Sequence, residues 1–172
     1  MAKRAILLVA EARETSSRAL GELRDLVRGI YPPVLADRGL GDAVRALAPD
    51  KPVRAETDID LGGRLDPPVE SACYFAVAEV LANAVKHADA RAVQIRVRQE
   101  TDRPASRARS RLPRSPGTLR LTVTDDGIGG AALGKGHGLR GLDDRLRAAG
   151  GRLQVISPDG GPTTVTAELP CR

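Results

Sequence analysis

The sequence is poor in aromatic residues and cysteine. Both scarcities limit the kinds of hydrophobic core and of metal or redox site that the protein can have. Its 172 residues, enough for one domain of ordinary size, include no tryptophan, one phenylalanine and two tyrosines. The hydrophobic core must therefore come from Leu, Val, Ile and Ala. Cys73 and Cys171 form neither a metal-ligand nor a redox spacing, and so low a cysteine count suits a reducing cytosol.

Long hydrophobic runs are also missing, and a bilayer span needs roughly 18–20 such residues. The run AILLVA at residues 5–10 is too short, and no cleavage signal follows it. We therefore expect a soluble, cytoplasmic chain without a transmembrane segment. Whether a parent protein is anchored in a membrane is left open.

The chain carries a net charge of +5, most of which falls in one segment. Between Thr101 and Thr118 lie five arginines, opposed by the single acid Asp102. Such a segment could belong to a basic nucleic-acid-binding module, whose binding would depend strongly on salt. It lacks the interleaved aromatic side chains that stack on bases, so a solvated loop is the simpler interpretation and no nucleic-acid partner is expected.

Residues from about Arg4 to Gly29 have the apolar spacing of one long amphipathic helix, which Gly29 and the Pro32-Pro33 pair then end. Its apolar stripe predicts a partner helix, in another subunit or in a part of the protein outside this chain. Folding back onto the same domain is the alternative. Residues 1–30 are thus set apart as this helix, and residues 31–52 as a stretch with a short helix.

The remaining pattern predicts an α/β (α+β) two-layer sandwich over residues 53–172, with a mixed, mostly antiparallel sheet and helices on one face. Alternation predicts strands and proline and glycine signals bound the helices. The expected elements are a short helix within Leu35–Ala48 with a turn at Gly39, strands Val53–Asp60, Ala92–Gln99 and Leu119–Asp125, helices Pro67–His87 and Gly138–Gly150, and a closing hairpin of strands Arg152–Ser157 and Thr163–Pro170.

The first motif with chemical content is EVLANAVKHA, residues 79–88, on the helix predicted over Pro67–His87. Helical spacing puts Glu79, Asn83, Lys86 and His87 along one flank. An amide oxygen suits Mg²⁺, a carboxylate can take a proton, and an ammonium can offset phosphate charge. A solvated helix edge would have the same composition, so this motif alone decides nothing.

Two glycine-rich motifs follow. In TDDGIGG, Asp125 ends a predicted strand, and Gly127 and Gly129 would let a flat ring approach it; a simple hairpin turn is the alternative. In GKGHGLRG, residues 134–141, glycines alternate before a helix and could expose amide donors to an anion. The spacing fits neither a Walker loop nor a dinucleotide fingerprint, and a flexible linker would also have such glycines.

In this order, the three motifs resemble the N box and the two glycine boxes of the GHKL (Bergerat-fold) ATP-binding superfamily. The KHA and GHGLRGL forms, the GGPTTVTAELP ending and the linker-like RGIYPPVLADRGLGDAVRALA are similar to sensor histidine kinases of the NarL/DesK-like group. The resemblance covers nearly the whole chain. It implies ATP and Mg²⁺ as ligands, and signal transduction in a two-component system. It also implies that residues 1–30 are the C-terminal helix of a dimerisation region, without that region's first helix, and that residues 31–52 are a linker.

The resemblance also implies roles for individual residues. Glu79 corresponds to the general base or its orienter, Asn83 to the Mg²⁺ ligand, and Asp125 to the acid that reads adenine. The other residues that it places at ATP are Lys86, His87, Gly127, Gly129, Gly136, His137, Gly138, Leu139 and Thr163. The chain departs from the family pattern in its long basic loop and in Pro162, where a third glycine is usual.

A phosphoacceptor histidine in an ELHD-like segment is missing, since the chain's two histidines, His87 and His137, lie in the other motifs. We expect an ATP-dependent protein-histidine kinase domain that donates the γ-phosphoryl group to a histidine outside this chain and does not phosphorylate itself. Its expected partners are the phosphoacceptor region of the parent kinase, a response regulator and, through the N-terminal helix, a second copy. Alternatives are a stand-alone serine kinase of the anti-sigma-factor type and a dimerisation partner with weak ATP binding.

Overall fold

A computed structural model describes residues 32–48, 53–101, 117–134 and 137–171 of the chain. The helix expected over residues 4–29 lies outside these ranges, as does most of the basic segment. Within them, no helix is long and apolar enough to cross a bilayer.

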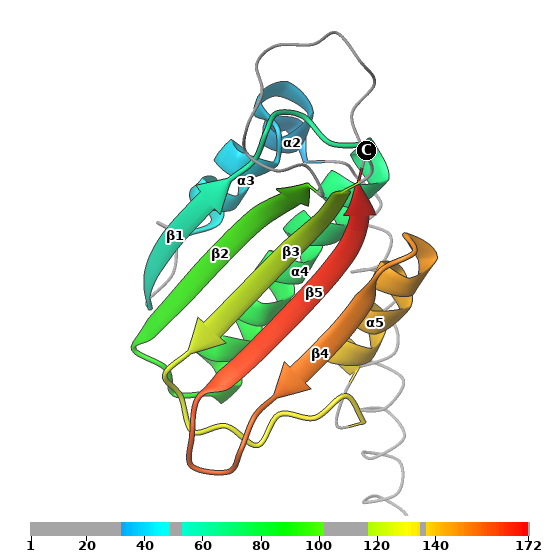
Figure 1. Ribbon diagram of the computed structural model, residues 1–172. Helices are drawn as coiled ribbons and strands as arrows, with labels where there is room; N and C mark the ends of the chain where they lie inside the picture. Colours follow the sequence, from blue (N-terminus) through cyan, green and yellow to red (C-terminus); the bar gives the residue numbers. More distant parts are fainter. Residues whose placement is uncertain (1–31, 49–52, 102–116, 135–136, 172) are drawn as a thin grey trace, which may run out of the picture. The chain divides into compact units, whose positions relative to one another are not determined.

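Five strands in the described part of the chain form one sheet (Figure 1). Its order is β1 (Arg54–Asp60), β2 (Ala92–Thr101), β3 (Gly117–Asp125), β5 (Thr163–Cys171) and β4 (Arg152–Ile156). Strands β1 and β2 run parallel, and the other three pairings are antiparallel. The expectation of a mixed, mostly antiparallel sheet is therefore confirmed.

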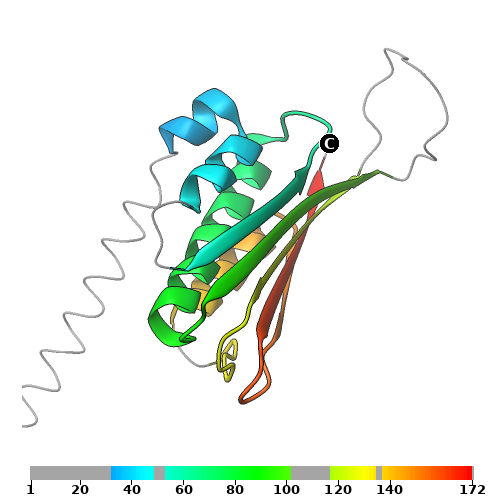
Figure 2. The same cartoon turned by 90° about the vertical axis from the view of Figure 1, so that its left-hand side faces the viewer.

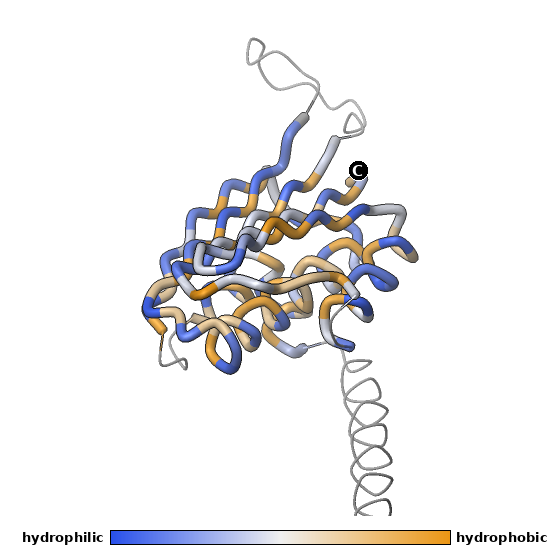
Figure 3. The backbone as a smooth tube through the Cα atoms, turned by 90° about the horizontal axis from the view of Figure 1, so that it is seen from below, coloured by the Kyte–Doolittle hydropathy of each residue, from blue (hydrophilic) through white to orange (hydrophobic). Residues whose placement is uncertain are grey.

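The sheet has one apolar and one polar face because apolar residues alternate with polar ones along each strand (Figure 3). The apolar face includes Ile95, Leu121 and Val165, all buried. On the polar face, Arg120 pairs with Glu100 of β2 and Glu168 of β5 at 3.0 and 2.9 Å. The buried pattern fixes the register, since a slip of one residue would turn every apolar side chain to solvent.

Within the described residues, four helices lie on the apolar side of the sheet, which confirms the two-layer sandwich (Figure 2). They are α2 (Pro33–Arg38), α3 (Leu40–Leu47), α4 (Pro67–His87) and α5 (His137–Ala148). Helix α5 ends at Ala148, and Gly150 follows it with a φ of 74°, which suits glycine. The short helix expected within Leu35–Ala48 is preceded by another, so that two short helices meet at Gly39, where φ is 83°. The turn expected at Gly39 is therefore confirmed. Pro33 begins the first of these helices because its fixed φ suits that position.

Helix α4 buries one apolar stripe against the sheet. Its members recur at spacings of three and four residues, and all are buried: Val69, Ala72, Cys73, Ala76, Val77, Val80 and Ala84. Burial, together with the nearby Glu70 carboxylate, raises the pKa of the Cys73 thiol to about 12. This thiol stays protonated and acts as a core side chain.

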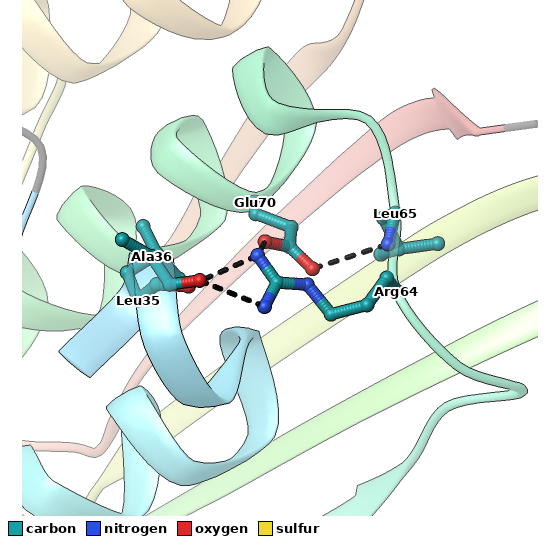
Figure 4. Close-up of polar contacts among 5 residues, drawn as sticks. All are labelled: Leu35, Ala36, Arg64, Leu65 and Glu70. Atoms are coloured by element: carbon teal, nitrogen blue, oxygen red, sulfur yellow. Dashed lines mark hydrogen bonds and ion pairs between the residues drawn. The ribbon is translucent and has the colours of Figure 1, made fainter. Parts of the chain in front are cut away.

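Helix α2 is tied to the start of α4 by a buried carboxylate that the sequence pattern did not single out (Figure 4). Glu70 is only 1% exposed, and it accepts hydrogen bonds from the Arg64 guanidinium at 3.0 Å and the Leu65 amide at 3.1 Å. The same guanidinium donates to the carbonyls of Leu35 and Ala36 at the end of α2, both at 3.1 Å. Arg64 therefore joins three segments, and we call this cluster the Arg64–Glu70 joint.

Replacing Arg64 by alanine should destabilise the fold, because the buried Glu70 carboxylate would lose its charged partner. We expect the free energy of unfolding to fall by about 2–4 kcal/mol, measured by denaturant titration. The control is Arg45→Ala, which breaks the exposed ion pair with Asp42 and should cost less than about 1 kcal/mol. If both substitutions lowered the free energy of unfolding equally, a stabilising role of the Arg64–Glu70 joint would be contradicted.

Candidate functional site

Three of the predicted motifs meet at one end of the sheet, drawn at the bottom of Figure 1. Asp125 ends β3 and lies directly opposite Thr163, which begins β5. The turn after β3 is fastened to the end of α4, because the Ile128 amide donates to the Ala88 carbonyl at 2.9 Å. The start of α5 lies against Glu79 of α4, as detailed below. The topology thus brings together segments of α4, β3, α5 and β5 that are far apart in the sequence.

Asp125 is a buried carboxylate, 3% exposed, on the helix-covered side of the sheet. Its Oδ1 accepts hydrogen bonds from the Gly127 amide at 2.9 Å and, more weakly, from the Thr163 amide at 3.5 Å. Both bonds use the same oxygen, so the carboxylate is held in one orientation and Oδ2 is the atom left to meet a ligand. A buried acid held in this way suits selective recognition of a hydrogen-bond donor.

The neighbouring Asp126 has a different function in the structure. Its Oδ1 accepts hydrogen bonds from the amides of Ala92 and Arg91 at 2.9 and 2.8 Å. These two bonds, that of Ala92 first, hold the pKa of the Asp126 carboxyl below its usual value. Asp126 is exposed and fastens the end of β3 to the start of β2, so its role is to position the turn that carries Asp125.

The glycines after Asp125 are required by close approaches of the backbone. A Cβ on Gly127 would lie 2.6 Å from the Cβ of Ala88 and closer still to the Ala88 carbonyl oxygen. Gly129 has a φ of 69°, and a Cβ there would lie 2.6 Å from the Gly161 carbonyl oxygen. Both positions therefore exclude a side chain, and the turn remains narrow beside the acid.

The β4–β5 turn docks on the segment that follows Gly129. The Gly160 amide donates to the Ile128 carbonyl at 2.8 Å, and the Gly130 amide donates to the Ser157 carbonyl at 3.3 Å. The Ser157 hydroxyl accepts from the Ala131 amide at 2.9 Å and shares a hydrogen bond with the Thr163 hydroxyl at 2.8 Å. Thr163, expected at the site, is 6% exposed, whereas Ser157 was not singled out by any motif.

Along α4, Glu79 and Asn83 are half-buried, and Lys86 and His87 are exposed. The first turn of α5 lies directly on Glu79: a Cβ on Gly138 would be 3.0 Å from the carboxyl carbon of Glu79, and nearer to its Oε1. A side chain at position 138 would require the Glu79 carboxylate to move from this place. The flank of α4 and the start of α5 are thus neighbours, as the order of the motifs suggested.

Helix α5 is held on α4 by its own side chains. His137, its first residue, is exposed, while Leu139 is buried at 8% exposure. The Arg145 guanidinium lies 4.7 Å from the centre of the Phe75 ring, a cation–π contact between the two helices. Gly136, which was also expected at the site, lies outside the described residues.

Two further features bear on what the site can hold. Among the described residues, no three His, Cys, Asp or Glu side chains converge as a metal cluster. A shallow hollow of about 320 Å³ is lined by residues of the polar face of the sheet, among them Arg54, Glu56 and Gln94, and by Asp125 and Asp126 at the end of β3. Asp125 therefore borders this hollow, whereas Glu79 and Asn83 of α4 do not line it.

The fold and the acid-and-glycine turn define an α/β ATP-binding domain of the GHKL class. In agreement, residues 69–172 match the family described as histidine kinase-, DNA gyrase B- and HSP90-like ATPases. The chain belongs to this family.

Its relatives include several sensor histidine kinases. The chain is 32% identical to an uncharacterized sensor-like histidine kinase of Chloroflexus aurantiacus, over 94% of this chain and 28% of that protein. It is 32% identical to the sensor histidine kinase NarS of Mycobacterium tuberculosis, over 87% of this chain and 34% of the relative. The chain thus spans about a third of the length of the curated relatives it matches.

A solved structure has the same fold. The blue-light activated histidine kinase of Erythrobacter litoralis superposes with a TM-score of 0.55 and 22% identity, over 77% of this chain and 40% of that one. At this identity the likeness concerns the fold alone. It confirms the α/β architecture expected from the sequence.

Gly127→Ala should destabilise the domain, because the new Cβ would meet the fixed backbone of Ala88. We expect a loss of about 1–3 kcal/mol in the free energy of unfolding, measured by denaturant titration. Gly134→Ala is the matched control, since nothing lies within 4 Å of a Cβ at that position. A Gly127→Ala variant as stable as the Gly134→Ala variant would contradict the packing described for this turn.

Proposed function

We propose that this chain is the catalytic domain of a two-component sensor histidine kinase, which binds Mg-ATP and donates the γ-phosphoryl group to a histidine outside this chain. The single observation that carries the proposal is the buried Asp125, held by the Gly127 and Thr163 amides in a turn that packs on Ala88 at the end of α4. The sensor kinases among the relatives support the kind of reaction.

Asp125 would bind the adenine ring. Its Oδ2 can accept a hydrogen bond from the exocyclic amine, and a base without that amine would leave the buried acid unpaired, at a cost in affinity. Gly127 and Gly129 carry no side chain, so a flat ring can approach the turn closely. Thr163 supports the same end of the pocket through its amide and its hydroxyl.

The phosphates would lie between the Asn83 end of α4 and the start of α5. A half-buried amide oxygen such as that of Asn83 suits Mg²⁺, and the rest of its shell would be phosphate oxygens and water, because Mg²⁺ rarely needs an all-protein cage. When bound, Mg²⁺ supplies neutralisation of phosphate charge. Lys86, His87 and His137 would add positive charge or donors, and the glycines at 136 and 138, with Leu139, would form the segment over the phosphates.

Glu79 would act on the acceptor, as a general base or as the group that orients one. Phosphoryl transfer to histidine needs mainly positioning and charge stabilisation, and little covalent chemistry from the domain. The contact between Glu79 and the first turn of α5 supports a carboxylate close to the proposed phosphate position.

The proposal also includes the phosphoacceptor region, a dimer of the kinase and a response regulator. The phosphoacceptor region would belong to the parent kinase, residues 1–30 would contribute a helix to dimerisation, and residues 31–52 would link it to the domain at 53–172. A response regulator would receive the phosphoryl group, and the domain would work in the cytoplasm. An anti-sigma-type serine kinase shares the nucleotide site but would phosphorylate serine.

Asp125→Asn should weaken Mg-ATP binding about 10- to 100-fold, because the amide presents a donor or a weaker acceptor to the adenine amine. Calorimetric titration of both proteins measures this. Asp144→Asn, which removes an exposed carboxylate of α5, is the control and should bind as the native chain does. Equal affinity of the native and Asp125→Asn proteins would refute the adenine assignment.

Incubation with ATP labelled at the γ-phosphate should leave the chain itself unlabelled, because neither His87 nor His137 lies in an acceptor motif. Acid-labile label on the chain would contradict this expectation. Adding the phosphoacceptor segment of the parent kinase should give acid-labile, alkali-stable label on that segment, whereas acid-stable label on a partner serine would favour the anti-sigma-type alternative.

A further inference from the structure

Ser157 follows β4 directly and touches both halves of the proposed nucleotide site, although no motif includes it. We propose that Ser157 is a positioning residue that fixes the segment Gly130–Gly134 to the adenine end of the pocket, and thereby favours binding of the phosphates more than binding of the base. The proposal rests on the nucleotide-binding function inferred above.

The contacts of Ser157 run in two directions. Toward the pocket, its hydroxyl is 2.8 Å from the Thr163 hydroxyl, and the Thr163 amide reaches Asp125. Toward α5, its hydroxyl accepts from the Ala131 amide at 2.9 Å, and its carbonyl accepts from the Gly130 amide at 3.3 Å. One residue therefore connects the buried acid to the first residues of the segment that leads into α5.

The side chain is needed for this link, not the backbone alone. A serine hydroxyl has one donor and two acceptor positions, so it can accept from Ala131 and still exchange a hydrogen bond with Thr163. Alanine at this position would keep the carbonyl bond to Gly130 but would remove both hydroxyl bonds. The Ala131 amide and the Thr163 hydroxyl would then lose their common partner.

The link bears on the phosphate end because the chain between Ala131 and α5 is short. Only six peptide steps separate Ala131 from His137, a reach of about 20 Å when fully extended. Packing on α4 holds the α5 end of this stretch, where Gly138 rests on Glu79, and the Ser157 hydroxyl holds its other end at Ala131. Without the fixed point, binding would have to order this segment as well, which lowers affinity.

The test compares a ligand that has phosphates with one that lacks them. Ser157→Ala should lower ADP affinity about tenfold, as expected for the loss of hydrogen bonds of ordinary strength, and adenosine affinity less than about threefold, both measured by displacement of a fluorescent nucleotide. Ser157→Thr, which keeps the hydroxyl, should restore ADP binding. Thermal unfolding of each variant reports whether it is folded. Ser157→Cys provides a second variant without the hydroxyl bonds, because a thiol is similar in size but forms only weak hydrogen bonds.

Thr164, the residue after Thr163 on β5, provides a matched control. Thr164 shares a hydroxyl–hydroxyl bond of 3.1 Å with Thr124, but on the polar face of the sheet. Thr164→Val removes a similar bond there and should leave the affinities for both ligands unchanged.

The outcomes separate this proposal from the one on which it rests. Equal losses for ADP and adenosine, or no loss in both Ser157→Ala and Ser157→Cys, would overturn the positioning role of Ser157. Asp125→Asn should weaken both ligands alike. If it weakens neither, the adenine assignment itself fails, whatever the serine variants do.

Discussion

The placement of the Asp125 carboxylate at the buried end of β3 is the constraint on which the rest of the site depends. A polar group buried there needs hydrogen-bond partners, and the Gly127 and Thr163 amides supply donors to it. This requirement fixes the β3–β5 register at its last pair, Asp125 opposite Thr163. It also requires a turn without side chains, since Gly127 and Gly129 pass against Ala88 and Gly161.

The two ends of α4 have separate tasks. At its start, Glu70 and Arg64 tie the helix to α2, and in its second half Glu79 lies against the start of α5. A helix of 21 residues packed along its apolar stripe on the sheet is a stiff connection between these places. The Arg64–Glu70 joint therefore determines where α4 lies, and α4 in turn carries the proposed catalytic acid and metal ligand.

Local patterns predicted much of this structure. The alternation of the strands, the apolar stripe of α4 and the turn at Gly39 follow from spacing and backbone chemistry alone, and all three are observed. Glu70 was missed because an acid in the first turn of a helix normally faces solvent and complements the helix dipole. Ser157 was missed because its partners, Ala131 and Thr163, are brought to it by the hairpin and not by any short motif.

The account places nucleotide on the helix-covered side of the sheet, between Asp125 and the Asn83 end of α4, and not over the polar-face residues of the hollow that Asp125 also borders. A titration of the isotope-labelled chain with Mg-ADP, followed through its backbone amide resonances, tests this most directly. We predict saturating shifts at Gly127, Ala131 and Thr163, together with Asn83 on α4. Shifts confined to Arg54, Glu56 and Gln94 around the polar-face hollow would contradict the account.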